Sequence, residues 1–317
     1  KAAEGLAAYS KRFAGNPFLT RAVGVIDALK DAVKRQGEEK ETQKVEEREV
    51  KEEPPPEAKA GEPDSLTEAQ LRDRLQAVNP AVAYEEIELH QDNMGRVVDV
   101  RIISTEVCEL SPLAALGSLK VLHCAAVPLE HWWVRGATCK VKNIAVLRKM
   151  PLEQLYLGGC QIKDLSPLKG LPLKFLDVRD TEIDDLSPLL GMELETLNVS
   201  RSKVKDLAPV RTLTKLKTFT ANGIKAYDFR PLMECPLAEL DLSDTQFKDG
   251  SLLKNMALRN LNVANTKLYE FAALKDMPLT RLSVAGTQIK DLNLLQGKSL
   301  NYLDVSGCSI GDIGVVR

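Results

Sequence analysis

A repeat of about 21 residues runs through the last two thirds of the chain and restricts its fold more than any other feature. The pattern L-x-x-L-x-L starts at Leu152, and copies follow at 173, 194, 216, 237, 258, 279 and 300. Two earlier copies start at Val97 and Leu119. Ten copies in one register predict a solenoid, in which each repeat buries its apolar side against its neighbours.

One copy shows how a repeat folds. The segment LKFLDVRDTEIDDLSPLLGME, which starts at Leu173, opens with alternating apolar residues, and this alternation predicts a strand. Ser187 and Pro188 then suggest an N-cap followed by the first helical residue. Few residues remain before the next strand, so we expect the return to be a 3₁₀ turn or a very short helix.

These motifs carry a family resemblance over residues 65–317. The run MPLEQLYLGGCQIKDLSPLKGLPLKFLDV resembles the short leucine-rich repeats of planctomycete-like bacterial proteins, many of which are attached to serine/threonine protein kinases. The resemblance implies an α/β solenoid with parallel strands on its concave face and short 3₁₀ turns on its convex face. It says much less about function, because one fold supports many functions.

A helix followed by a hairpin is expected to cap the first repeat. Thr67-Glu-Ala-Gln70 is a capping-box pattern that opens a helix reaching about Val78. The segment 84–90, a turn at 92–95 and the segment 96–102 then suggest a β-hairpin whose second arm is also the first repeat strand. We therefore divide the repeat domain into a cap, 65–96, and repeats, 97–317.

The first 64 residues differ from a folded repeat domain. Residues 1–35 suggest two short helices, which are either the end of an upstream helical-repeat or coiled-coil domain or a weakly ordered helical hairpin. Residues 36–64 hold 5 basic and 11 acidic groups and a run of three prolines. This composition predicts a disordered linker, with an acidic docking tail as the alternative. Because the sequence starts at Lys1, we expect it to be a fragment.

The net charge and the positions of the cysteines limit the possible functions and the cell compartment. The net charge of −2 argues against nucleic-acid binding, and no apolar run is long enough to span a membrane. The six cysteines lack C-x-x-C spacing, and Cys160 and Cys308 lie seven repeats apart, too far for a disulfide. With Cys124 they are expected to pack in the core. Unpaired thiols and the lack of an opening signal peptide favour the cytoplasm, although an upstream anchor would allow the cell envelope.

The resemblance places the outward strand residues on the concave face, where we predict a surface for a protein or peptide. About 12 residues are also inserted into the repeat that starts at Leu119, and they contain both tryptophans. This excursion is either a binding loop or a cover for the core that the insertion opens. The candidate partner-binding residues are His123, Trp132, Trp133, Arg135, Tyr156, Phe175, Asp177, Asn198, Glu239, Asp241, Asn262, Arg281, Tyr302 and Asp304.

We expect no catalytic residue, metal or cofactor. The three histidines show no metal-ligand spacing, and the nucleotide-binding, hydrolase and kinase motifs are missing from the sequence. Asp177, Asp241 and Asp304 share a column, but each pair is three strands apart, roughly 14 Å, which is too far to share one ion.

The leading interpretation is a non-enzymatic protein-interaction or scaffold module, acting as a monomer. The alternative is a sensory or targeting region of a larger bacterial enzyme, such as a serine/threonine kinase.

Overall fold

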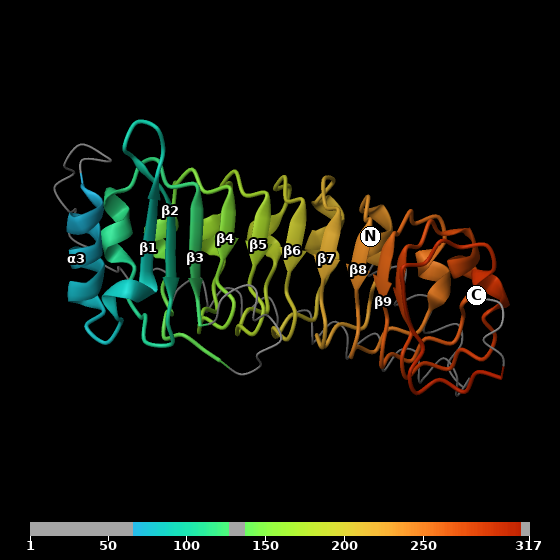
Figure 1. Cartoon of the computed structure of the whole chain (residues 1–317). Helices are drawn as coiled ribbons and strands as arrows, with labels where there is room; N and C mark the ends of the chain where they lie inside the picture. The colour runs from blue at the N-terminus through green and yellow to red at the C-terminus, as the bar shows by residue number, and fades with distance from the viewer. Residues whose placement is uncertain (1–65, 127–136, 312–317) are drawn as a thin grey trace, which may run out of the picture. The chain divides into compact units, whose positions relative to one another are not determined.

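The computed structural model describes residues 66–126 and 137–311. In these residues eleven strands form one sheet, in the order in which they occur along the chain (Figure 1). The only α-helix described, α3 (Glu68–Val78), precedes them. The strands are β1 (Ile87–Gln91), β2 (Val97–Ile103), β3 (Val121–Ala125), β4 (Gln154–Tyr156), β5 (Phe175–Asp177), β6 (Thr196–Asn198), β7 (Thr218–Thr220), β8 (Glu239–Asp241), β9 (Asn260–Asn262), β10 (Arg281–Ser283) and β11 (Tyr302–Asp304).

The parallel stack from β2 to β11 follows the predicted repeat. Equivalent residues pair across each interface from β4 onward, so that Leu155 lies beside Leu176 and Leu176 beside Leu197. These central leucines are fully buried, and the first and third apolar positions of the pattern are buried in most repeats. One continuous apolar core therefore runs from α3 to the last repeats, which confirms the expected solenoid.

The helix and hairpin of the cap form as expected, with one difference. The Thr67 hydroxyl accepts a hydrogen bond from the Gln70 N–H, and the Gln70 side chain accepts one from the Thr67 N–H, which completes the capping box. Strands β1 and β2 pair antiparallel. The expected strand from residue 84 is wrong at its start, because Tyr84–Glu86 is a 3₁₀ turn. The Glu86 carboxylate accepts the Ala83 N–H at 2.8 Å, which closes that turn before the strand begins.

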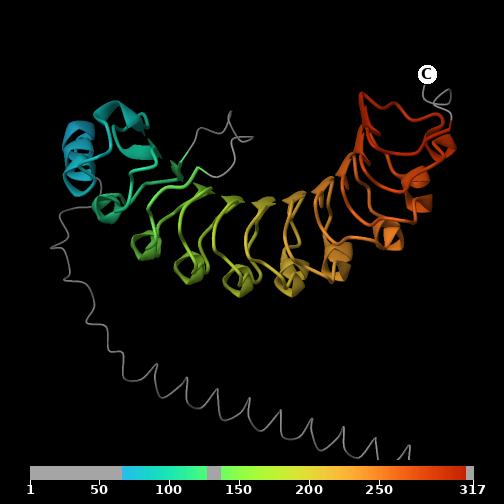
Figure 2. The same cartoon turned by 90° about the horizontal axis from the view of Figure 1, so that it is seen from below.

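Each repeat returns through a short turn on the side opposite the strands, the outer side of the curve in Figure 2. The 3₁₀ turns of the repeats are Ser111–Ala115, Ala145–Leu147, Ser166–Leu168, Ser187–Leu189, Ala208–Thr212, Arg230–Glu234, Gly250–Leu253, Ala272–Asp276 and Asn293–Leu295.

The predicted N-cap role of Ser187 is wrong. Asp185 accepts the Ser187 N–H at 2.7 Å and the Ser187 hydroxyl at 2.6 Å, so the aspartate two residues earlier caps the turn. Asp164 does the same for Ser166. A carboxylate is the stronger acceptor, because a hydrogen bond to a charged group exceeds one to a neutral hydroxyl.

A column of small polar residues supports the bend after each strand. The hydroxyls of Thr181, Ser202 and Thr245 each donate to the carbonyl three residues earlier, at 2.6 Å. Thr266 and Thr287 repeat the contact. All five residues are buried, so each bond satisfies a carbonyl that water cannot reach.

The residue before that column adopts a left-handed backbone conformation. Glycine occupies it at Gly159 and Gly223, but Asp180, Arg201, Asp244 and Asn265 also have φ near 55–58°. Asp and Asn tolerate this region better than most residues, whereas an arginine there is unusual. Arg201 is held by Asp180, whose two carboxylate oxygens each accept a guanidinium hydrogen bond at 2.6 Å.

The predictions for residues 1–35 and 36–64 lie outside the described residues. Among the described residues, no helix combines the length and apolar character that crossing a membrane requires.

The buried hydroxyl column gives a direct stability test. Replacing Thr245 with Val keeps its shape but leaves the Leu242 carbonyl without its 2.6 Å donor. The free energy of unfolding should fall by about 1–3 kcal/mol. Thr245→Ser, which retains the hydroxyl, should lose clearly less. Urea titration followed by circular dichroism measures both, and an equal loss in both variants would contradict the role given to the hydroxyl.

Candidate partner-binding face

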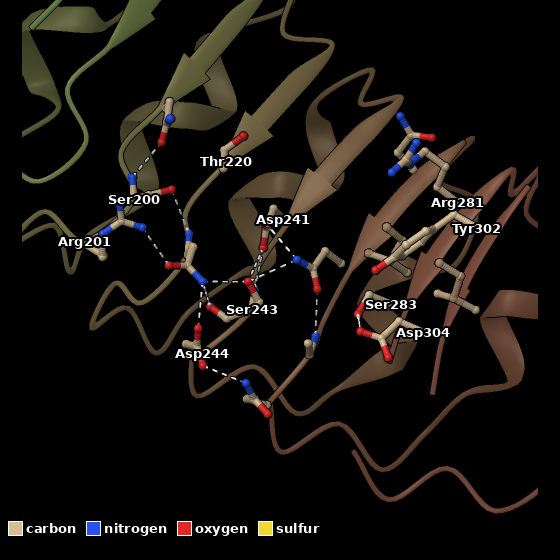
Figure 3. Close-up of a pocket in the computed structure, with 18 of the residues that line it drawn as sticks. Ser200, Arg201, Thr220, Asp241, Ser243, Asp244, Arg281, Ser283, Tyr302 and Asp304 are labelled. Atoms are coloured by element: carbon tan, nitrogen blue, oxygen red, sulfur yellow. Dashed lines mark hydrogen bonds between the residues drawn. The ribbon is translucent and has the colours of Figure 1, made fainter. Parts of the chain in front are cut away.

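A groove of about 640 Å³ lies along the strands and their exits, between the end of β5 and β11. Figure 3 shows its polar side chains facing one another from successive strands. Six of the predicted residues line it: Asn198, Asp241, Asn262, Arg281, Tyr302 and Asp304. The residues that the sequence analysis did not select include Arg179, Ser200, Arg201, Asn222, Ser243 and Asn265.

The Asp and Asn residues at the strand ends shape the backbone as well as the surface. In Asp241, one carboxylate oxygen accepts the Ser243 N–H at 2.9 Å and its hydroxyl at 2.6 Å. Asn198 and Asp304 make the same N–H contact two residues ahead, at 3.0 Å. This recurring turn explains why the column is Asp or Asn in so many repeats. The other side-chain atom of each Asp or Asn, which does not hold the turn, lines the groove.

A second set of polar residues lies at the strand exits. The Asn222 amide donates to the Ser243 hydroxyl at 2.7 Å and to the Asp244 carboxylate at 2.9 Å. The Asn265 amide donates to the other Asp244 oxygen at 3.0 Å, and Arg201 donates to the Asn222 carbonyl oxygen. These bonds connect four successive repeats, so the groove wall is fixed before anything binds. Arg201, Asp244 and Asn265 share the position directly before the hydroxyl column, whereas Asn222 lies one residue earlier, before Gly223.

Arg281 and Tyr302 form the end of the groove at β10 and β11. The Arg281 guanidinium lies over the Tyr302 ring, 4.9 Å from its centroid, and 44% of the Tyr302 surface is exposed. Below them, the Ser283 hydroxyl donates to Asp304 at 3.4 Å. This corner presents a cation, an aromatic ring and a carboxylate together.

Three aromatic rings stack across β3, β4 and β5. The His123 and Tyr156 ring centroids are 5.0 Å apart, and those of Tyr156 and Phe175 are 4.4 Å apart. Tyr156 and Phe175 are half-buried. Burial raises the pKa of the Tyr156 hydroxyl, so it stays neutral and can donate a hydrogen bond.

Two predicted surface residues are buried, which corrects the expectation that the whole column is accessible. His123 is 4% exposed because the Tyr156 ring covers it. Asp177 is 2% exposed and turns back toward Arg179, whose N–H it accepts at 3.0 Å. Burial raises the pKa of the Asp177 carboxyl, against the opposing effect of the nearby Arg179 charge.

Of the remaining candidates, only Glu239 is among the described residues. Glu239 is exposed on β8 but does not line it. Trp132, Trp133 and Arg135 lie outside the described residues, so their predicted role in binding stays a prediction. The inserted segment leaves from Ala126 at the end of β3 and returns at Ala137.

Comparison with known proteins supports the fold described above. An internalin (inlF) from Listeria monocytogenes superposes with a TM-score of 0.62 at 22% identity, over 78% of this chain and 71% of the internalin chain. A family model described as "Leucine Rich repeat" matches residues 298–317. The fold is that of a leucine-rich repeat solenoid.

Further structures share this leucine-rich repeat arrangement. A plant ice-binding protein gives a TM-score of 0.55 at 15% identity and covers 76% of this chain and 86% of its own. A second internalin from the same Listeria species gives 0.50 at 18% identity, with 74% and 92% covered. No curated protein sequence matches. At these identities the solved structures establish the fold of the solenoid and nothing about its ligand.

The buried carboxylate on the concave face predicts a pH effect. Burial raises the Asp177 pKa above 3.8, so the folded state binds this proton more tightly than the unfolded state. This contribution to stability is present at low pH and is lost as pH rises through the folded-state pKa. Asp177→Asn keeps the acceptor for the Arg179 N–H and removes the buried charge. The variant should gain stability relative to the wild type as pH rises from 4 to 7, measured by urea unfolding. A difference that is constant over this range would contradict the burial effect.

Proposed function

We propose that this chain is a non-catalytic interaction module that binds an extended segment of a protein partner in its concave groove. The groove itself carries the proposal, because polar side chains from six successive strands line one continuous recess. A recess that crosses many parallel strands suits a ligand that runs across them. A small molecule would fill only part of it.

The size of the groove fits a short peptide. Strands β6 to β11 are separated by about 4.8 Å each, so the recess extends roughly 24 Å. An extended chain advances about 3.3 Å per residue, so about seven residues of a partner would span it. Because the stack of strands is curved, the groove is slightly shorter than this on the concave face.

The charges in the groove favour a polar partner with both signs. Asp241, Asp244 and Asp304 face the recess, and so do Arg201 and Arg281. Arg201 is already paired with Asp180, whereas Arg281 is exposed and contacts an aromatic ring. Exposed arginine and tyrosine contribute much of the binding energy at many interfaces, because they combine large contact areas with hydrogen bonds. We assign the strongest contacts to Arg281 and Tyr302.

The same observations favour binding over catalysis. The described residues that line the groove include no histidine, cysteine, glutamate or lysine. Its three aspartates accept hydrogen bonds from neighbouring hydroxyls and amides, which fixes them as structural acceptors. Attachment to a larger enzyme such as a serine/threonine kinase stays the alternative, suggested by the resemblance of the repeats.

Selection from a random peptide library tests the proposal. Twelve-residue peptides selected against the full 317-residue chain should bind the double variant Arg281→Ala/Tyr302→Ala at least about tenfold more weakly, because each truncation removes a central contact. Fluorescence anisotropy with labelled peptides measures the affinity.

Tyr269→Ala is the matched control. Tyr269 is 59% exposed and does not line the groove, so its loss should leave the affinity within twofold. Peptides that bind the double variant as well as the wild type, or that lose equal affinity with the control, would show that the groove is not the binding surface.

A further inference from the structure

Three cysteines that are distant in sequence converge in the core beside the insertion. Cys124 lies in β3, Cys139 follows the inserted segment, and Cys160 follows β4. Their Sγ atoms all lie within 4.8 Å of one another, and none of the three is more than 1% exposed. A single buried cysteine is an ordinary core residue, but three converging thiols raise the question of what chemistry they share.

Cys139 and Cys160 occupy the same position in consecutive repeats. They are 21 residues apart, and both stand in the column that is Thr or Ser in most other repeats. They pair as a parallel bridge, with the Cys139 N–H donating to the Gly159 carbonyl at 3.0 Å. In-register neighbours on parallel strands lie about 4.8 Å apart, which falls within the Cα separation of about 4.4–6.8 Å that disulfides require.

The two sulfur atoms are closer than unbonded atoms should be. The Cys139 and Cys160 Sγ atoms are 2.7 Å apart. Unbonded carbon atoms pack about 3.5–4.0 Å apart, and sulfur is no smaller, whereas a disulfide bond is about 2.05 Å long. An approach of about 0.65 Å would form the bond, whereas a separation of about 0.8–1.3 Å would restore an ordinary packing distance.

The other cysteines behave differently, although one stands at an equivalent position. The Cys308 thiol donates to the Val284 carbonyl at 3.1 Å, and Cys235 donates to the Val210 carbonyl at 3.3 Å. Cys160 makes a contact equivalent to that of Cys308, because its thiol donates to the Cys124 carbonyl at 3.2 Å. Among the described residues, however, Cys139 and Cys160 are the thiols in direct contact with each other. The close pair is specific to the repeats on either side of the insertion.

A metal ion explains the cluster less well. Two thiolates on one zinc ion, each about 2.3 Å from the metal, lie about 3.8 Å apart, so the close pair would have to separate by about 1 Å. Three thiolates would also leave a net negative charge inside the apolar core that contains all three cysteines. A disulfide is uncharged and costs no such burial.

We propose that Cys139 and Cys160 form a disulfide by exchange with a low-molecular-weight disulfide, while Cys124 remains a thiol. The Cys139 thiolate attacks one sulfur of the small disulfide and releases one small thiolate, which takes up a proton. Cys160, after losing its proton, attacks the Cys139 sulfur of the mixed disulfide and releases the second small thiol. Two protein S–H groups are oxidised to one S–S bond, and one small disulfide is reduced to two thiols.

The surroundings of Cys139 support its place as the first nucleophile. Hydrogen bonds from the Cys124 and Cys160 thiols lower the pKa of the Cys139 thiol, and the same contacts raise the pKa values of its two neighbours. The reactive form is the thiolate, so one of the three is prepared to attack.

The bond would join the residue that follows the insertion, Cys139, to the next repeat. Ala137 lies where the insertion returns, and a Cβ atom at Gly159 would lie only 2.5 Å from the Ala137 carbonyl oxygen. Cys124 directly follows His123, whose ring stacks on Tyr156. Oxidation would therefore link the residue that follows the insertion to the exit of β4, beside Cys124.

Mass spectrometry of the full chain tests the proposal. The chain is incubated in mixtures of reduced and oxidised glutathione, both folded and during refolding from urea, and remaining thiols are then alkylated. The folded protein should react slowly, because the thiols are buried. The product should lack two hydrogens, contain a peptide pair joined through Cys139 and Cys160, and melt at a higher temperature than the reduced chain.

Matched variants identify the pair. Cys124→Ser and Cys235→Ala should both keep the bond and the melting shift, whereas Cys139→Ser and Cys160→Ser should lose both. Absence of the linked peptides under both conditions, or a bond that includes Cys124, would overturn the proposal. So would one zinc ion per chain, measured by native mass spectrometry after addition of zinc alone, if Cys124→Ser abolishes its binding.

Discussion

The in-register stacking of each strand on the next is the constraint on which the rest of the structure depends. A three-residue strand cannot bury its leucine alone, so each central leucine relies on those of the two neighbouring repeats. Register also aligns the polar atoms at the bend, where buried hydroxyls donate to carbonyls that would otherwise lack partners. Once the leucines set the register, the residues at each other position of the repeat are also aligned in a column across successive strands.

These columns give the concave face two roles at once. The Asp and Asn residues at the strand ends hold the exit turns and also form the wall of the groove. Their side chains are fixed by hydrogen bonds within the solenoid, so a ligand meets a surface that is already ordered, and little further entropy is lost on binding. Arg281 and Tyr302 contact one another and remain exposed, which leaves them available as anchors.

Sequence reasoning succeeded where the determinants are local or strictly periodic. The capping box at Thr67 and the strand centres depend on short motifs and a constant spacing. Sequence reasoning failed where the outcome depends on which residues are in contact in the folded chain. The burial of Asp177 depends on side chains from adjacent strands, and the choice of Asp185 over Ser187 as the cap depends on which acceptor is stronger. Cys139 was missed because the insertion moves it out of register, although its distance of 21 residues from Cys160 preserves the repeat period.

Amide hydrogen exchange tests most directly the claim that the groove is the binding surface. The full chain would be compared alone and saturated with a selected peptide. The account predicts slower exchange in β6 to β11 and in the exits that follow them, because the ligand covers this part of the concave face. The outer turns, such as Ala272–Asp276, should exchange at the same rate in both states. Slower exchange confined to the outer turns, or to the cap strands β1 and β2, would contradict the account.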